Sequence, residues 1–363
     1  MTTWKVALAF RGARFALPTI LLAGGLASAP GLPAQETYRV DGGHVAIYNL
    51  AGEVEVVRGR GSQVEVDVSR GGADQARLQV EVGRVGDAQA LRVIYPEDRV
   101  VYERMGRSNT TIRVRDDGTF FRNRSLGGLW DGDEVRISGR GRGLEAHADM
   151  IVRVPAGVSV AIFLAAGSGR ADGLASDLEF RTASGSVEVA GIVGDVEVDT
   201  GSGSVAVADV EGDVTADTGS GSIGLEDIRG DRLSADTGSG SVTGRNVSVA
   251  ELLVDTGSGG IRIEDLSAGD VECDTGSGSV YLGMLSDVDR LVVDTGSGSV
   301  SLEVPRDFGA ELELDTGSGG ISVDVPDRVV ETSRRHHFRG SVGDGDGTVV
   351  IDTGSGGVTI RRS

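Results

Sequence analysis

The chain has 363 residues, a formal net charge of −20 at pH 7, 58 glycines and only 4% aromatic residues. Such acidity repels phosphate backbones and anionic lipid headgroups, which argues against nucleic acid and an anionic membrane surface as partners. The single cysteine excludes an intramolecular disulfide.

The first 34 residues have the pattern of a secretory signal peptide. They carry Lys5, Arg11 and Arg14, then an apolar run from Phe15 to Ala29, and no acidic residue. The run is short and is interrupted by proline and glycine, so a permanent membrane anchor is the weaker interpretation. We therefore expect export to the periplasm, the cell surface or the extracellular space, with no transmembrane span after removal of residues 1–34.

Residues 35–160 are predicted to form an N-terminal β region that caps one end of a stack. Val64, Val66 and Val68 alternate with polar residues, as in a strand with one buried face. Between residues 97 and 150 the alternation weakens, and we expect long charged loops or an irregular hairpin there. That segment holds ten arginines, which either bind an anionic polymer or form a solvated face.

Residues 161–363 are dominated by one repeated motif. Asp-Thr-Gly-Ser-Gly occurs eight times, and the first seven copies follow one another at intervals of 18 to 21 residues. A fixed period of this length indicates a stack of equivalent units, none of which buries its apolar face alone. The copies begin at Asp199, Asp217, Asp236, Asp255, Asp274, Asp294, Asp315 and Asp352.

Each unit is predicted to contain two short strands joined by glycine-rich turns. Apolar residues alternate before the motif, as at Val196 and Val198, and again after it, as at Val205 and Val207. The predicted fold class is all-β: a single-stranded parallel β-helix, or β-solenoid, with about ten coils of about 19 residues. Parallel crossovers favour a right-handed coil.

The same alternation assigns each motif residue to one side of the strand. The threonine faces inward and the aspartate faces outward. Cys273 occupies an inward position equivalent to Val198, so we expect a buried apolar thiol rather than a nucleophile or a metal ligand. The glycines suit stacked tight turns, because no Cβ then intrudes between coils.

The outward aspartates form a candidate cation ladder. In an in-register stack, neighbouring carboxylates lie about 4.8 Å apart, and each ionised pair repels by about 0.9 kcal/mol at the dielectric constant of water. Hydrogen bonds from turn amides are the favoured compensation, and weak cation association, for example with calcium, is the alternative. The ladder comprises Asp199, Asp217, Asp236, Asp255, Asp274, Asp294 and Asp315.

The interval between Asp315 and Asp352 spans nearly two periods, with one motif missing. We expect its arginine- and histidine-rich part, residues 334–339, and its Gly-Asp-Gly-Asp-Gly part, residues 343–347, to be loops. Neither part has the full ligand pattern of a zinc or calcium site.

The last predicted strand, residues 358–360, is expected to end the stack. An open sheet edge invites pairing with other strands, and the charges of Arg361 and Arg362 discourage it. We expect no catalytic residue and no cofactor anywhere in the chain.

Three sequence features point to a known family. They are the Val-Pro-x-Gly segment at residues 154–157, the serial Thr-Gly-Ser-Gly turns, and the closing segment from Phe338 to Gly356. In these the chain resembles a bacterial adhesin-like β-strand-repeat family of unknown function, related to the "head GIN putative adhesin" domains. The resemblance covers most of the mature chain. It implies a single-stranded β-helix and an extracytoplasmic location, and it supplies no catalytic residue.

Two enzymatic interpretations compete with a structural or binding role. Asp-Thr-Gly-Ser also surrounds the catalytic aspartate of pepsin-like proteases, but that chemistry needs two carboxylates, one from each lobe, whereas eight copies recur here at coil spacing. A polysaccharide lyase or hydrolase is the stronger alternative, because a β-helix can display paired carboxylates along a groove. We expect a non-catalytic, adhesin-like module whose partner is a polysaccharide or another cell-surface component.

Overall fold

The computed structural model describes residues 35–121, 132–326 and 328–363. The predicted signal peptide, residues 1–34, lies outside the described residues. The described parts contain 30 strands and two single 3-10 turns, η1 (Gln75–Arg77) and η2 (Glu103–Met105). The strands form one sheet of 26 and one sheet of four, so the all-β class is confirmed. No helix in these parts of the chain is long and apolar enough to cross a membrane.

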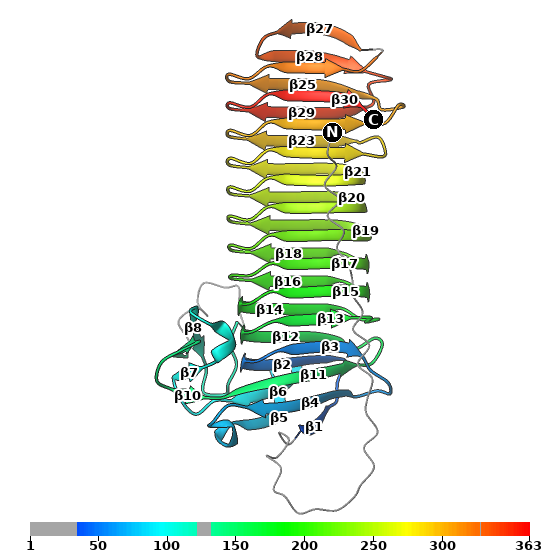
Figure 1. Cartoon of the computed structure of the whole chain (residues 1–363). Helices are drawn as coiled ribbons and strands as arrows, with labels where there is room; N and C mark the ends of the chain where they lie inside the picture. The colour runs from blue at the N-terminus through cyan, green and yellow to red at the C-terminus, as the bar shows by residue number, and fades with distance from the viewer. Residues whose placement is uncertain (1–34, 122–131, 327) are drawn as a thin grey trace, which may run out of the picture. The chain divides into compact units, whose positions relative to one another are not determined.

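Most of the large sheet consists of two series of parallel strands (Figure 1). We call the strands that precede each glycine-rich turn the first series, and those that follow it the second series. The first series includes β2 (His44–Ala51), β12 (Ser159–Ala166), β14 (Leu178–Ser184), β16 (Val196–Thr200), β18 (Val214–Thr218) and β23 (Arg290–Thr295). The second series includes β3 (Val54–Arg58), β13 (Gly169–Asp172), β15 (Val187–Val193), β17 (Val205–Glu211), β22 (Val280–Met284) and β24 (Val300–Val304). Three long strands run from the second series into the first: β19 (Ile223–Thr237), β20 (Val242–Thr256) and β21 (Ile261–Thr275).

The pairing register of these strands follows the sequence repeat. Val198 lies opposite Ala216, which lies opposite Ala235, and the same line continues through Val254 and Cys273. Each step is parallel and joins residues 18 or 19 positions apart. One period of sequence therefore advances the chain by one strand in the series, which gives the long, mostly parallel arrangement.

The inward positions of both series share one hydrophobic core. Val198 and Leu252 of the first series are completely covered, and Val205 and Ile261 of the second are 1% exposed. Burial of apolar surface contributes about 25 cal/mol per Å² removed from water, so the period-two pattern is the main source of stability. A single strand pair cannot bury its own apolar surface. The stability of each pair therefore depends on packing against its neighbours.

The parallel series begins at His44, well ahead of the repeat region predicted from residue 161. β2 pairs with β12 and β3 pairs with β13, both in parallel. Beyond them lie β6 (Ala88–Ile94), parallel to β2, and β11 (His147–Val154), parallel to β3. Antiparallel strands then end both series: β5 (Gln79–Val85) on β6, β4 (Val64–Gly71) on β11, and β1 (Gln35–Val40) on β4.

A four-stranded sheet lies in the segment for which we expected long loops or an irregular hairpin. Its strands are β7 (Arg99–Val101), β8 (Asn109–Val114), β9 (Asp133–Ser138) and β10 (Leu144–Glu145). Val100 and Ile137 of this small sheet belong to a second hydrophobic cluster together with Tyr48 and Phe163 of the large sheet. The rings of Tyr48 and Phe163 stack with their centroids 4.6 Å apart. The strands are too short, at two to six residues, for alternation to reveal them.

The chain end does not end the stack, which corrects the prediction for residues 358–360. The C-terminal strands are β25 (Ala310–Thr316), β26 (Ile321–Asp324), β27 (Val329–Arg334), β28 (His337–Val342), β29 (Gly347–Thr353) and β30 (Val358–Arg362). β29 pairs in parallel with both β23 and β25, and β30 pairs in parallel with both β24 and β26. The last two strands thus lie between two strand pairs that precede them in sequence (Figure 1). Arg361 and Arg362 are not at an open edge.

Residues 334–339 are not a loop either. β27 and β28 form an antiparallel hairpin, and β28 pairs antiparallel with β25. Phe338 of this hairpin is 5% exposed and belongs to the main core. Two predictions were wrong here, the strand that ends the stack and the loop at residues 334–339. Both assumed that the order of the units in space is their order in the chain. The missing motif marks a terminating hairpin, whereas most of the Gly-Asp-Gly-Asp-Gly run does connect strands as a turn.

Candidate functional site

The repeated threonine is the buried polar centre of each glycine-rich turn. Thr256 is completely buried, on the inward side predicted for it. Its Oγ1 donates a hydrogen bond to the Gly240 carbonyl oxygen of the preceding turn at 2.8 Å, and accepts one from the Gly259 backbone nitrogen at 3.0 Å. The same two bonds recur at Thr218, Thr237, Thr275, Thr295, Thr316 and Thr353. Each buried hydroxyl therefore ties one turn to its neighbour, at about 0.5–1.5 kcal/mol per bond.

The second glycine of each motif is required by close contact between turns. A Cβ on Gly259 would lie 1.7 Å from the Gly240 carbonyl oxygen, and a Cβ on Gly240 would lie 1.8 Å from that of Gly221. No side chain tolerates such distances, so close backbone packing between turns explains the second glycine of the motif.

The predicted aspartate ladder is present as a line of cross-strand neighbours. Asp315 is the exception to the predicted order, because Asp352 lies between it and Asp294. The remaining members are neighbours in the predicted order: Asp199, Asp217, Asp236, Asp255, Asp274 and Asp294.

Two ladder members show the electrostatic effect of this alignment. Burial raises the pKa of the Asp255 carboxyl, and the charge of Asp236 raises it further. Burial also raises the pKa of Asp274, with additional contributions from Asp255 and Glu272. Hydrogen bonds from turn amides would have lowered these pKa values, and in these turns the Gly259 and Gly278 amides bond to threonine instead.

Cation binding by the ladder stays a prediction. Within the described parts of the chain, no group of three or more histidine, cysteine, aspartate or glutamate side chains is placed to hold one. The histidine pair makes separate contacts: His336 Nδ1 lies 2.9 Å from the Gly319 carbonyl oxygen, and His337 Nδ1 lies 2.8 Å from Asp315 Oδ1. These contacts attach the β27–β28 hairpin to the end of β25 and to the turn that follows it.

Cys273 is 1% exposed and lies between Val254 and Val293 in the first series. Burial raises the pKa of its thiol to about 12, and the charge of Glu272 adds to the shift. At neutral pH the group is a protonated thiol in an apolar environment, which suits packing and not nucleophilic attack.

Sequence reasoning missed a second line of aspartates, at the other corner of several successive units. Asp195 Oδ1 accepts a hydrogen bond from the Asp213 backbone nitrogen at 3.0 Å, and Asp213 Oδ1 accepts one from that of Asp231 at 2.9 Å. These carboxylates bond to the next strand's backbone. The sequence does contain a signal for this line: Gly-Asp pairs begin at residues 194, 212 and 230, at intervals of 18.

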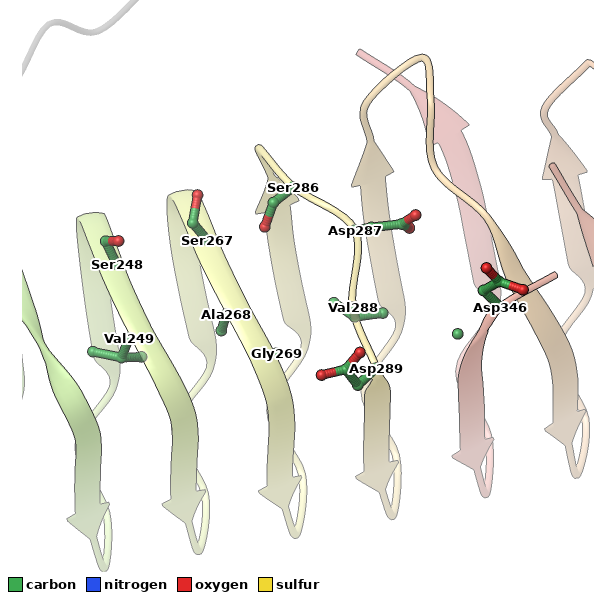
Figure 2. A pocket seen from close by; sticks show the side chains of 11 residues that line it. Ser248, Val249, Ser267, Ala268, Gly269, Ser286, Asp287, Val288, Asp289 and Asp346 are labelled. Carbon is green, nitrogen blue, oxygen red and sulfur yellow. The ribbon is translucent and has the colours of Figure 1, made fainter. Parts of the chain in front are cut away.

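This corner also carries an open hollow of about 350 Å³ (Figure 2). It lies where the long strands β20 and β21 give way to the non-strand residues 285–289. Ser248 and Ser267 lie opposite each other on one side, and the carboxylates of Asp287 and Asp289 lie on the other. Asp287 Oδ1 accepts a hydrogen bond from the Gly309 backbone nitrogen at 2.9 Å. Hydroxyl and carboxylate oxygens so arranged can hydrogen-bond a neutral polyol.

A larger groove, of about 620 Å³, lies beside β3, β11 and β13. Asp67 in this groove is 7% exposed and pairs with Arg153 at 2.6 Å. A hydrogen bond from Thr37, together with Arg153, holds the pKa of this carboxyl below its ordinary value. The charged residues of the lining are Glu53, Glu55, Asp67, Asp149, Arg170 and Glu188.

Comparison with known proteins identifies the family to which the sequence is similar. Residues 137–361 match the model of the family described as toastrack DUF4097. No curated protein matches the sequence. The crystal structure of a "putative cell adhesion protein" from Clostridium sporogenes is similar over 91% of this chain and 100% of that one, with 9% sequence identity and a TM-score of 0.20.

The family match confirms the resemblance that the repeated motifs indicated. It spans residues 137–361, which is well over half of the 363-residue chain. The protein therefore belongs to the toastrack DUF4097 family.

Proposed function

We propose that the protein is a non-catalytic, adhesin-like binding module of the cell envelope or cell surface. In this proposal the parallel series is a single-stranded, right-handed β-helix of about ten coils of about 19 residues. The register supports such a coil, because successive parallel steps join residues 18 to 20 positions apart, as one chain winding on itself requires.

The observation that carries a binding role is the in-register repetition of exposed polar side chains. Asp236 and Ser239 are exposed at one turn, and Asp255 and Ser258 are exposed at the next. The same pair is exposed again at Asp274 and Ser277, and at Asp294 and Ser297. A surface with this periodicity suits a polymer with repeating units, because equivalent weak contacts along one ligand add up. A polysaccharide or another cell-surface component is the partner that we favour.

A carbohydrate-active enzyme, either a polysaccharide lyase or a hydrolase, is the second candidate. The acid-lined groove beside β3 favours it, since glycoside hydrolysis uses two carboxyl groups. One of them has to act as a general acid, which requires a raised pKa. The pKa of Asp67 is lowered instead, and its carboxylate is held by Thr37 at 2.6 Å and Arg153 at 2.6 Å. This arrangement suits a permanent ion pair, so we place binding ahead of turnover.

The location is proposed from the sequence. Residues 1–34 have a basic start, an apolar run and no acid, which favours export to the periplasm or beyond. The net charge of −20 supports a partner other than nucleic acid.

The test is a survey of purified protein against neutral and acidic cell-wall polysaccharides, with retention and the release of reducing ends measured on the same samples. We expect retention of at least one polysaccharide without release of reducing ends. Turnover that disappears in the Asp67→Asn variant would favour the enzyme instead. Failure to retain any polysaccharide or intact cell surface would contradict the binding role.

A further inference from the structure

The small sheet gathers arginine side chains around one hollow of about 380 Å³. Arg99, Arg136, Arg140 and Arg142 line it, together with Ser138 and two acids. All four arginines are exposed, and within the described part of the chain no ion pair includes any of them. The lining is therefore net positive, on a chain whose formal net charge is −20.

The strand register brings two of these arginines together. Arg99 of β7 lies opposite Arg136 of β9 in a parallel pair. Like charges at directly opposite positions destabilise a sheet, and an anion between them removes that cost. Arg136 alternates along β9 with Val135 and Ile137, which belong to the second hydrophobic cluster. The guanidinium groups therefore project from the face of the small sheet that is opposite its buried side.

The other two arginines lie on a Gly-Arg-Gly-Arg-Gly loop whose ends are tightly packed. A Cβ on Gly139 would lie 2.3 Å from the Gly106 carbonyl oxygen, and a Cβ on Gly143 would lie 2.5 Å from the Arg99 carbonyl oxygen. In addition, Ser138 Oγ donates a hydrogen bond to the Arg140 carbonyl oxygen at 3.1 Å. These close approaches place both ends of the loop beside η2 and β7, and Arg140 and Arg142 line the same hollow as Arg99 and Arg136.

We propose that this hollow binds the carboxylate of an acidic sugar residue in a polysaccharide; the inference rests on the proposed function and deepens it. Paired guanidinium groups bind carboxylates in planar, bidentate geometry. Asp98, Glu134 and Ser138 of the lining accept hydrogen bonds from sugar hydroxyls. The volume is near the lower limit of ordinary ligand pockets and accommodates about one or two sugar units.

The lining chemistry favours a glycan over nucleic acid. Asp98 and Glu134 repel the closely spaced phosphates of a nucleic acid backbone, and among the described lining residues none is aromatic and able to stack a base. A long polyanion of high charge density would also meet the acidic remainder of the surface.

The test is calorimetric titration of the purified protein with trigalacturonate, with neutral galactotriose as the uncharged control. We expect saturable binding of trigalacturonate alone, and a loss of affinity of about tenfold or more in Arg140→Gln/Arg142→Gln. Arg334→Gln/Arg335→Gln is the matched control, because it removes the same charge at exposed positions outside the hollow. Thermal melting verifies that each variant is folded.

Each other result overturns the site in a way that separates it from the proposed function. Equal losses in the two double variants would assign the affinity to net charge. Absence of trigalacturonate binding would remove this site, while retention of another polysaccharide would leave the binding module in place. Tighter binding of single-stranded DNA or phosphatidylserine vesicles than of trigalacturonate would also remove it. Release of reducing ends would instead contradict the non-catalytic function.

Discussion

Asp294 and Asp352 lie opposite each other in neighbouring parallel strands, although 58 residues separate them in the chain. Asp315 follows Asp294 by only 21 residues, yet it lies one strand further along, beyond Asp352. The last strand pair of the chain is therefore held between two earlier ones. The hairpin β27–β28, and not the chain end, terminates the first series.

This order of strands predicts which engineered disulfides form. Val292 lies opposite Val350, and neighbouring strands are about 4.8 Å apart, within the range that a disulfide bridges. In a Cys273→Ala background, we expect Val292→Cys/Val350→Cys to oxidise in the native protein. Val292→Cys/Glu313→Cys should remain reduced, because β29 lies between those strands. Peptide mapping under non-reducing conditions distinguishes the two, and the reverse pattern would mean that the units stack in chain order.

The buried threonine line predicts a cost for removing one hydroxyl. Thr256→Val keeps the shape of the side chain but leaves the Gly240 carbonyl oxygen and the Gly259 amide without their partner. We expect the free energy of unfolding to fall by about 1–3 kcal/mol. Thr359→Val on the exposed side of β30 is the control and should change it by less than about 0.5 kcal/mol. Denaturant titration measures both, and equal effects would contradict a structural role for the hydroxyl line.

The stacked turns predict a strong dependence on one class of glycine. Gly259→Ala places a Cβ 1.7 Å from the Gly240 carbonyl oxygen, so neighbouring turns have to separate. We expect destabilisation of about 3 kcal/mol or more, or failure to fold. Gly320→Ala is the matched control, since its Cβ would meet nothing within 4 Å. A thermal melt of Gly259→Ala that coincides with that of Gly320→Ala would exclude tight contact between the turns.

The sequence predicted the features that depend on period and parity. The spacing of the motifs gave the register of the parallel series, and alternation placed Thr256 and Cys273 on the buried side. Pairings that no local pattern encodes were missed. The pairing of β2 with β12 joins segments on either side of an insertion, and β29 enters the series out of chain order. Predicting the arginine-lined hollow needs both kinds of information. The sequence shows the ten arginines, but only the strand pairing of the small sheet brings four of them together.

The buried thiol predicts slow modification of the native protein. Cys273 is 1% exposed, and its pKa is raised to about 12, so access and thiolate fraction are both low at neutral pH. We expect a thiol reagent to label it only after unfolding in denaturant. Ser277→Cys in a Cys273→Ala background provides an exposed control that should react at once. Fast labelling of native Cys273 would place this strand in the opposite register, because a shift of one residue exchanges its faces.

The aspartate line predicts a specific dependence of stability on pH. The folded-state pKa values of Asp255 and Asp274 are raised by burial first and by neighbouring carboxylates second. A raised carboxyl pKa means that the folded protein holds its proton more tightly than the unfolded chain. Below the unfolded-state pKa near 3.8, the two carboxyls therefore do not lower the free energy of unfolding. They lower it as the pH rises through their folded-state pKa values.

Asp255→Asn/Asp274→Asn removes this cost, so we expect its melting temperature to exceed that of the wild type at pH 7 by on the order of 1 °C, with a smaller difference at pH 4. Asp172→Asn, an exposed aspartate outside the line, should show no such dependence. Sodium chloride should reduce the difference at pH 7 by screening. If calcium at the same ionic strength instead stabilises the wild type far more than sodium does and leaves the variant unchanged, the line binds calcium specifically. That result would contradict screened repulsion as the explanation.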